Sequence, residues 1–125
     1  MSGQSVEIQL KTILDEVSKE VRDGVNDAAR SVGREAARQL RATSPKKTGA
    51  YASGWGVKTE PGAGGSITVI VRNSKMPGLT HLLEKGHLTR NKYGVWGRTP
   101  AHVHIAPVEE WANEEFAKRA EEILK

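Results

Sequence analysis

The feature of this sequence that most limits its fold is a run of apolar residues spaced three or four apart through its first third. The run consists of Leu10, Leu14, Val17, Val21, Val25, Ala28, Val32, Ala36 and Leu40. Such steps place side chains on one face of an α-helix. They predict an amphipathic helix over about residues 5–42, far longer than the average of about 11–12 residues. A chain of 125 residues has little other material to cover so long a stripe, so we expect part of it to pack on another chain.

Two glycines, Gly24 and Gly33, interrupt this helix. Each lowers helix stability by about 1 kcal/mol relative to alanine. A glycine in a helix either permits a local kink or lets another helix approach closely. The sequence leaves both interpretations open.

Proline, glycine and alternating apolar residues divide the middle of the chain. Ser44-Pro45 ends the helix, because proline disfavours helical geometry at the residue before it and donates no hydrogen bond. Apolar and polar residues then alternate on both sides of the glycine-rich segment 61–65. This pattern predicts an antiparallel hairpin over about residues 51–73.

The remaining segments complete the predicted fold. Leucines from Leu79 onward predict a short helix at 79–85, and the Gly-, Asn-, Arg- and Lys-rich residues 87–99 predict a long exposed loop. Alternation predicts a third strand at 102–105, and helical spacing predicts a C-terminal helix at 107–124. We therefore expect a single α+β domain over residues 1–125, with the helices covering one face of a small antiparallel sheet.

The net charge of +4 hides a strong segregation along the chain. Residues 1–27 hold three basic and six acidic side chains, residues 28–104 hold thirteen and three, and residues 105–125 hold three and six. The three segments thus carry net charges of −3, +10 and −3. A basic middle between acidic ends would suit either head-to-tail contact between copies or a positive surface that faces phosphate.

The sequence holds no recognisable catalytic or cofactor motif. It has no cysteine, no HExxH spacing, no phosphate-binding loop and no nucleophile elbow. His102 and His104 would share one side of a strand, as metal ligands can, but hydrogen-bonded structural histidines are the favoured interpretation. We therefore expect no enzyme activity, no catalytic residues, no metal and no cofactor.

Apolar runs in this sequence stay well short of the roughly 18 residues that a membrane span requires. The first residues lead directly into charged sequence, unlike a signal peptide. We expect a protein that is made in a cytoplasm and has no membrane partner.

Basic residues also raise the alternative of a DNA-binding module without sequence specificity. Arg30, Arg34, Arg38 and Arg41 recur at helical spacing, a pattern equally typical of a solvated helix face. No helix-turn-helix or other nucleic-acid motif accompanies them. The candidate residues for an interface or a DNA-facing surface are Arg30, Arg34, Arg38, Arg41, Lys46, Lys47, Arg90, Lys92, Trp96 and Arg98.

Three motifs in series resemble those of a known family. The run from Ser44 to Trp55 resembles the SP-x-x-TG-x-Y-x-x-x-W signature of small tail-component proteins of tailed phages and prophages. Residues 81–87 resemble that family's HLLE-x-GH segment, and residues 100–107 resemble its P-x-HI-x-P segment. The matching residues are Ser44, Pro45, Thr48, Gly49, Tyr51, Trp55, His81, Glu84, Gly86, His87, Pro100, His104 and Pro107.

This resemblance implies a non-enzymatic virion protein that acts in head–tail joining or tail completion. It implies a ring of identical subunits at the neck, located in the virion and made in the host bacterial cytoplasm. Its partners would be other copies, other neck and tail proteins, and DNA that crosses the neck, contacted without sequence specificity. For single residues, we expect Thr48 and Gly49 to form a tight turn into the first strand of the hairpin, and Trp55 to lie in the core beneath it. We expect Glu84, Gly86 and His87 to fix the start of the long loop, and residues 104–107 to form the final turn.

Overall fold

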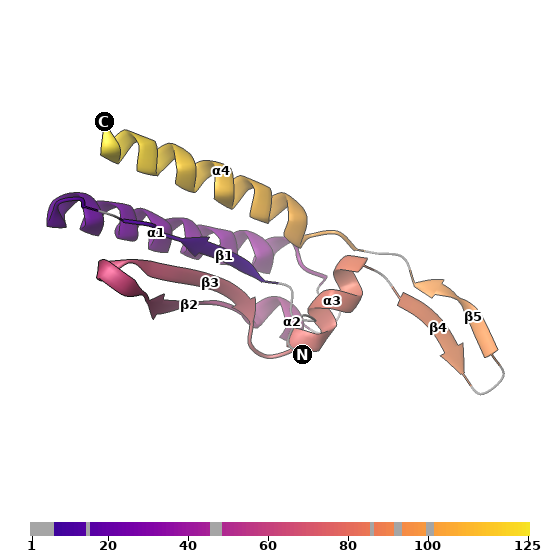
Figure 1. Cartoon of the computed structure of the whole chain (residues 1–125). Coiled ribbons are helices and arrows are strands. Elements are labelled where there is room, and N and C mark those ends of the chain that lie inside the picture. The colour runs from indigo at the N-terminus through magenta and orange to yellow at the C-terminus, as the bar shows by residue number, and fades with distance from the viewer. Residues whose placement is uncertain (1–6, 15, 46–48, 86, 92–93, 100–101) are drawn as a thin grey trace.

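The computed structural model describes residues 7–14, 16–45, 49–85, 87–91, 94–99 and 102–125, and it has the predicted α+β architecture. A long helix packs against both a three-stranded sheet and the C-terminal helix, and a separate β-hairpin projects from one end (Figure 1). The elements are β1 (Ile8–Lys11), α1 (Lys19–Thr43), α2 (Ala50–Ser53), β2 (Trp55–Pro61), a 3-10 turn (Ala63–Gly65), β3 (Ile67–Asn73), α3 (Pro77–Lys85), β4 (His87–Asn91), β5 (Gly94–Thr99) and α4 (Ile105–Leu124).

The sheet has the order β1-β3-β2, with both pairs antiparallel. Val69 of the central strand pairs with Leu10 on one side and with Thr59 on the other. Alternate residues of β1 and β3 are buried beneath the helices, whereas most of β2 is exposed. The predicted hairpin is confirmed as β2 and β3, but it begins at Trp55 and not at residue 51, because residues 50–53 form the short helix α2.

The predicted start of the long helix is wrong, because α1 begins at Lys19 and residues 8–11 form a strand. Ile8 and Leu10 are buried while Gln9 and Lys11 are exposed, which is the two-residue alternation of a strand. The helix has its own start signal at Ser18, whose hydroxyl accepts a hydrogen bond from the Val21 N–H at 3.2 Å. The Ser18 cap therefore sets the start of α1, whereas the apolar spacing alone predicts a start that is too early.

The predicted strand at 102–105 is also wrong, because the sheet takes its third member from β1 at the other end of the chain. His102 to His104 have no regular secondary structure, and α4 begins at Ile105, two residues before the predicted start. The backbone N–H groups of His104 and Ile105 donate to a carboxylate instead of a strand partner. These hydrogen bonds stabilise the start of a helix at this segment and not a strand.

Close packing, and no kink, explains the glycine at position 33. A Cβ atom on Gly33 would lie 2.6 Å from Cγ1 of the fully buried Val69, so the helix approaches the sheet at a distance that only glycine allows. Gly33 therefore allows close approach, as one of the two interpretations held, but the element that approaches is the strand β3 and not another helix. At Gly24 a Cβ would meet Ile123 of α4 at 3.4 Å, an ordinary van der Waals contact.

We expect Gly33→Ala to destabilise the protein by about 1–3 kcal/mol, because the new methyl group overpacks the helix–sheet interface. Gly24→Ala is the matched control. It adds the same group to the same helix, and alanine's higher helix propensity should make it neutral or stabilising by up to about 1 kcal/mol. Thermal and urea unfolding of both variants measure the difference. Equal effects at the two positions would contradict the close approach at Gly33.

The predicted exposed loop at 87–99 is a two-stranded hairpin, β4–β5, which we call the arm. His87 pairs with Thr99, and the register shifts between Thr89 and Arg90. Within the described chain, the arm's strands pair only with each other, and the arm extends away from the rest of the molecule (Figure 1). An isolated two-stranded hairpin is at best marginally stable in water.

Candidate functional site

Residues from three separate sequence motifs meet in one buried polar cluster where α2, α3 and the start of α4 come together (Figure 1). We call this group the motif cluster. Its members are Ser44, Tyr51, Trp55, Thr80, Glu84 and His104, all buried. Residues up to 60 positions apart in the chain are thereby joined at the base of the arm.

Glu84, on α3, caps the N-terminus of α4. Its Oε1 accepts hydrogen bonds from the N–H groups of His104 at 2.9 Å and Ile105 at 3.0 Å, and its Oε2 accepts from Ala106 at 3.0 Å. The first N–H groups of a helix lack partners within the helix and carry partial positive charge. A buried carboxylate satisfies both needs, so Glu84 fixes the direction in which α4 leaves the arm.

His104 connects this cap to Tyr51. Its Nδ1 lies 2.7 Å from the His102 carbonyl oxygen and 3.1 Å from Glu84 Oε1, and because both are acceptors, Nδ1 carries a proton. Its Nε2 lies 2.7 Å from the Tyr51 hydroxyl oxygen, which is 3.4 Å from Thr80 Oγ1. The chain of contacts therefore runs from α2 through His104 to α3.

The protonation states suit a fixed clamp and not proton transfer. Burial raises the pKa of Glu84, but the three backbone N–H groups and His104 outweigh it, so that the pKa lies below its ordinary value. Burial, aided by the negative charge of Glu84, raises the pKa of Tyr51 despite a hydrogen bond to Thr80. At neutral pH the cluster thus holds a carboxylate and a neutral phenol, each directed at other protein groups.

Trp55 forms the apolar floor of the motif cluster. Its indole N–H donates to Ser44 Oγ at 2.8 Å, and its ring makes edge contacts with Tyr51 and His104 at centroid distances of 5.8 and 6.3 Å. Asn73 donates from Nδ2 to the Tyr51 carbonyl oxygen at 2.7 Å. Thr80 and Asn73 were not identified from the sequence, where neither carries a distinguishing signal.

Gly49 adopts φ +82° and ψ −19°, which confirms the expected backbone conformation, but the turn leads into α2 and not directly into the first strand of the hairpin. The core position expected for Trp55 is also confirmed, since the residue is 2% exposed. Pro107 lies exposed in the first turn of α4, and His87 begins β4. Thr48, Gly86 and Pro100, together with the side chain of His81, lie outside what the structure describes.

The candidate basic residues divide between α1 and the arm. On α1, Arg34 and Arg38 are exposed, Arg30 pairs with Asp27 at 2.9 Å, and Arg41 donates from Nε to the Trp55 carbonyl oxygen at 3.2 Å. Arg90 lies on β4, and Trp96 and Arg98 lie on β5. Lys46, Lys47 and Lys92 lie outside the described residues.

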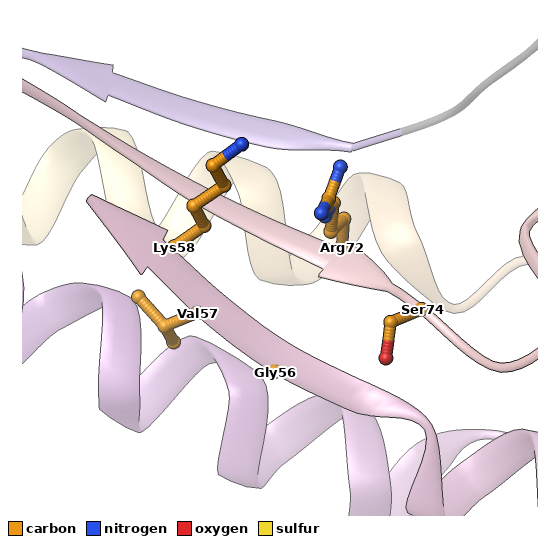
Figure 2. Close-up of a pocket in the computed structure, with 5 residues that line it drawn as sticks. All are labelled: Gly56, Val57, Lys58, Arg72 and Ser74. Atoms are coloured by element: carbon orange, nitrogen blue, oxygen red, sulfur yellow. The ribbon is translucent and has the colours of Figure 1, made fainter. Parts of the chain in front are cut away.

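A shallow hollow lies beside β2 and β3 (Figure 2). It is lined by Gly56, Val57, Lys58, Arg72 and Ser74. Lys58 and Arg72 project together from neighbouring strands, whereas Val57 lies against α1 (Figure 2). The hollow combines two cations and one hydroxyl without an accompanying acid or base pair, and Lys58 is already bound to Glu60 at 3.3 Å. We assign it no chemistry.

Among the described residues, no group of three or more acidic or histidine side chains is arranged to hold a metal ion. None of the described helices combines the length and the apolar character needed to cross a membrane.

Comparison with known proteins gives a family assignment. Comparisons with curated proteins and with solved structures find no match. The family model HK97-gp10-like, described as "Bacteriophage HK97-gp10, putative tail-component", matches residues 8–86. The match begins at β1 and ends just after α3, so it includes the sheet, α1 and most of the motif cluster. The chain therefore belongs to the HK97-gp10-like family of phage tail components.

Proposed function

We propose that this tail component is a non-enzymatic ring subunit at the phage neck, where it joins head to tail or completes the tail. Its partners are further copies of itself and other neck and tail proteins. It is made in the host bacterial cytoplasm and ends in the virion. Family membership supports a role in the tail, and the arm supports action through contacts with neighbouring proteins.

The arm is the observation that carries this proposal. Its two strands leave two free edges of backbone hydrogen-bonding groups outside the main sheet, and a hairpin of this kind gains stability from an external partner. Its base is held firmly, because Glu84 binds the start of α4 and the His102 N–H donates to the Leu83 carbonyl oxygen at 2.6 Å. A projecting element on a rigid base suits insertion into a neighbouring subunit.

Removing residues 88–98 tests the proposal. Because His87 and Thr99 face each other across the hairpin, an Asn-Gly turn can join them without moving the base. We expect a subunit that folds with an unchanged melting temperature but no longer assembles into rings. Circular dichroism measures folding, and negative-stain electron microscopy with native mass spectrometry measures assembly. Normal ring formation by the shortened protein would refute an assembly role for the arm.

The exposed Arg34 and Arg38 favour one second candidate, a DNA-binding module without sequence specificity. Binding driven by phosphate contacts weakens steeply as salt rises, because it releases counterions from DNA. Titration of the protein with random-sequence duplex DNA at several salt concentrations measures this. Tight binding to duplex DNA at physiological salt, with no self-association, would favour the second candidate.

A further inference from the structure

We infer that neighbouring subunits meet through two oppositely charged helix faces, the outer face of α1 on one copy and the outer face of α4 on the next. The arginine stripe consists of Arg30, Arg34, Arg38 and Arg41 on α1. The glutamate stripe consists of Glu110, Glu114 and Glu121 on α4, with Ala117 between the last two. The inference rests on the proposed ring and names the surface that builds it.

The two stripes match in length and spacing. Each begins and ends eleven residues apart, with intermediate steps of three and four, so each runs about 16 Å along one side of its helix. One stripe carries only arginines and the other only glutamates around one alanine. Two helices laid side by side would therefore bring opposite charges together along the contact except at Ala117.

Two charges of each stripe are exposed and, in the described part of the chain, unpaired. Arg34, Arg38, Glu110 and Glu114 are exposed, and within the described residues none of the four has an ion-pair partner. Other charges of the same two helices are already engaged. Arg119 of α4 binds Glu35 of α1 and Glu115 of its own helix, both at 2.8 Å. The free charges are thus those that face away from the intramolecular contact.

The stripes of one copy cannot meet each other. Arg119 and Ile123 face α1, as their contacts with Glu35 and Gly24 show. At 100° per residue, Glu114 and Glu121 lie on roughly the opposite side of α4. Contact between the stripes therefore requires two copies, and it joins different faces of each. A contact of this head-to-tail type generates rings when the rotation closes.

DNA fits these observations less well than a second copy does. The arginine stripe alone would suit phosphate, but α4 presents a nearby acidic face of matching dimensions that would repel DNA. Recognition of a protein partner requires neither a base-reading motif nor a basic groove. The chain itself supplies the complementary surface.

A charge exchange tests the inference directly. One variant carries Arg34→Glu and Arg38→Glu, and the other carries Glu110→Lys and Glu114→Lys. Alone, each brings like charges together, and we expect association at least about tenfold weaker than that of the unaltered protein. When the two variants are mixed, they can alternate around an assembly. One contact then pairs the unaltered stripes and the next pairs the two reversed stripes, so opposite charges meet in both. We expect the mixture to recover assembly in analytical ultracentrifugation at low salt.

A matched control separates this surface from general charge effects. Lys58→Glu with Arg72→Glu makes the same change in net charge on the outer side of the sheet (Figure 2). We expect it to assemble like the unaltered protein. The absence of native cysteine permits a second readout, because Arg38→Cys and Ala117→Cys in one chain give a single defined pair. A short bismaleimide should then link successive copies into a ladder on a denaturing gel.

The outcomes distinguish the interface from the ring. Rings that form despite both reversals and give no ladder would overturn this inference while leaving the proposed ring intact. A complete absence of self-association in the unaltered protein would overturn both. Linkage through Arg38→Cys alone would indicate a two-fold contact of α1 with α1 and would also overturn it. Loss of DNA binding without loss of assembly in Arg34→Glu, Arg38→Glu would assign the arginine stripe to DNA instead.

Discussion

Replacing Glu84 by alanine is expected to lower the free energy of unfolding by about 3–5 kcal/mol, because each buried donor left without its acceptor costs about 1–3 kcal/mol. The change leaves the N–H groups of His104, Ile105 and Ala106 without their acceptor in a buried site. It also removes the carboxylate beside His104 Nδ1. Urea unfolding followed by circular dichroism measures the loss.

Two control variants sharpen this prediction. Glu84→Gln keeps one oxygen acceptor and the side-chain volume, so its cost should be smaller than that of alanine. Glu60→Ala removes an exposed glutamate paired with Lys58, and we expect an effect below about 1 kcal/mol. A loss at Glu84→Ala no larger than at Glu60→Ala would show that the carboxylate does not hold the start of α4.

The stability supplied by Glu84 should also depend on pH. Because the folded protein lowers the pKa of this carboxyl, its contribution is fully present above the ordinary glutamate pKa of about 4.3 and is lost as pH falls through the lower folded value. Glu84→Gln does not titrate. The stability difference between the native protein and this variant should therefore be largest near neutral pH and shrink in acid.

The contrast between α1 and β1 shows how far the sequence could predict this fold. The face of α1 is repeated over seven turns, so its apolar period is unambiguous. By contrast, β1 offers only Ile8 and Leu10, and Leu10 also continues the helical spacing of Leu14 and Val17. Four residues cannot separate a period of two from one of 3.6. Pairing with β3, a contact with residues 68–71, decides the structure.

The arm was missed for a related reason. Its strands hold two glycines, one asparagine and two arginines, which weaken the sequence pattern expected of each strand when it is considered alone. What makes them strands is their pairing with each other. The composition of a short segment does not show which residues pair across strands. From the sequence alone, a hairpin of this composition is therefore indistinguishable from a loop.

The site was predicted in its parts and not in its assembly. The three motifs named Trp55, Glu84 and His104, yet their convergence depends on the packing of α3 and α4 around α2. The expected role of Glu84 was to begin the loop, whereas its carboxylate binds the first turn of α4. Nothing in the sequence distinguishes Thr80 from a polar helix residue that faces solvent, so only the folded structure identifies it as a member of the motif cluster.

Replacing Trp55 by alanine is the second large expected effect, a loss of about 3–5 kcal/mol in the free energy of unfolding. The side chain is 2% exposed and packs against Tyr51 and His104. Its removal would leave a cavity bounded by α1, α2 and the start of α4, which the surrounding backbone cannot readily fill. Trp111→Ala, at a partly buried position on α4, is the control and should cost less.

A smaller pair of substitutions separates the volume of Trp55 from its hydrogen bond. Trp55→Phe leaves the buried Ser44 hydroxyl without its donor, and Ser44→Ala leaves the indole N–H without its acceptor. Each should cost about 1–3 kcal/mol for the unsatisfied group, in addition to lost packing for phenylalanine. Because the double variant removes both groups, its cost should fall below the sum of the two single costs. Strict additivity would show that the 2.8 Å contact contributes no coupling, and that Trp55 acts through its volume alone.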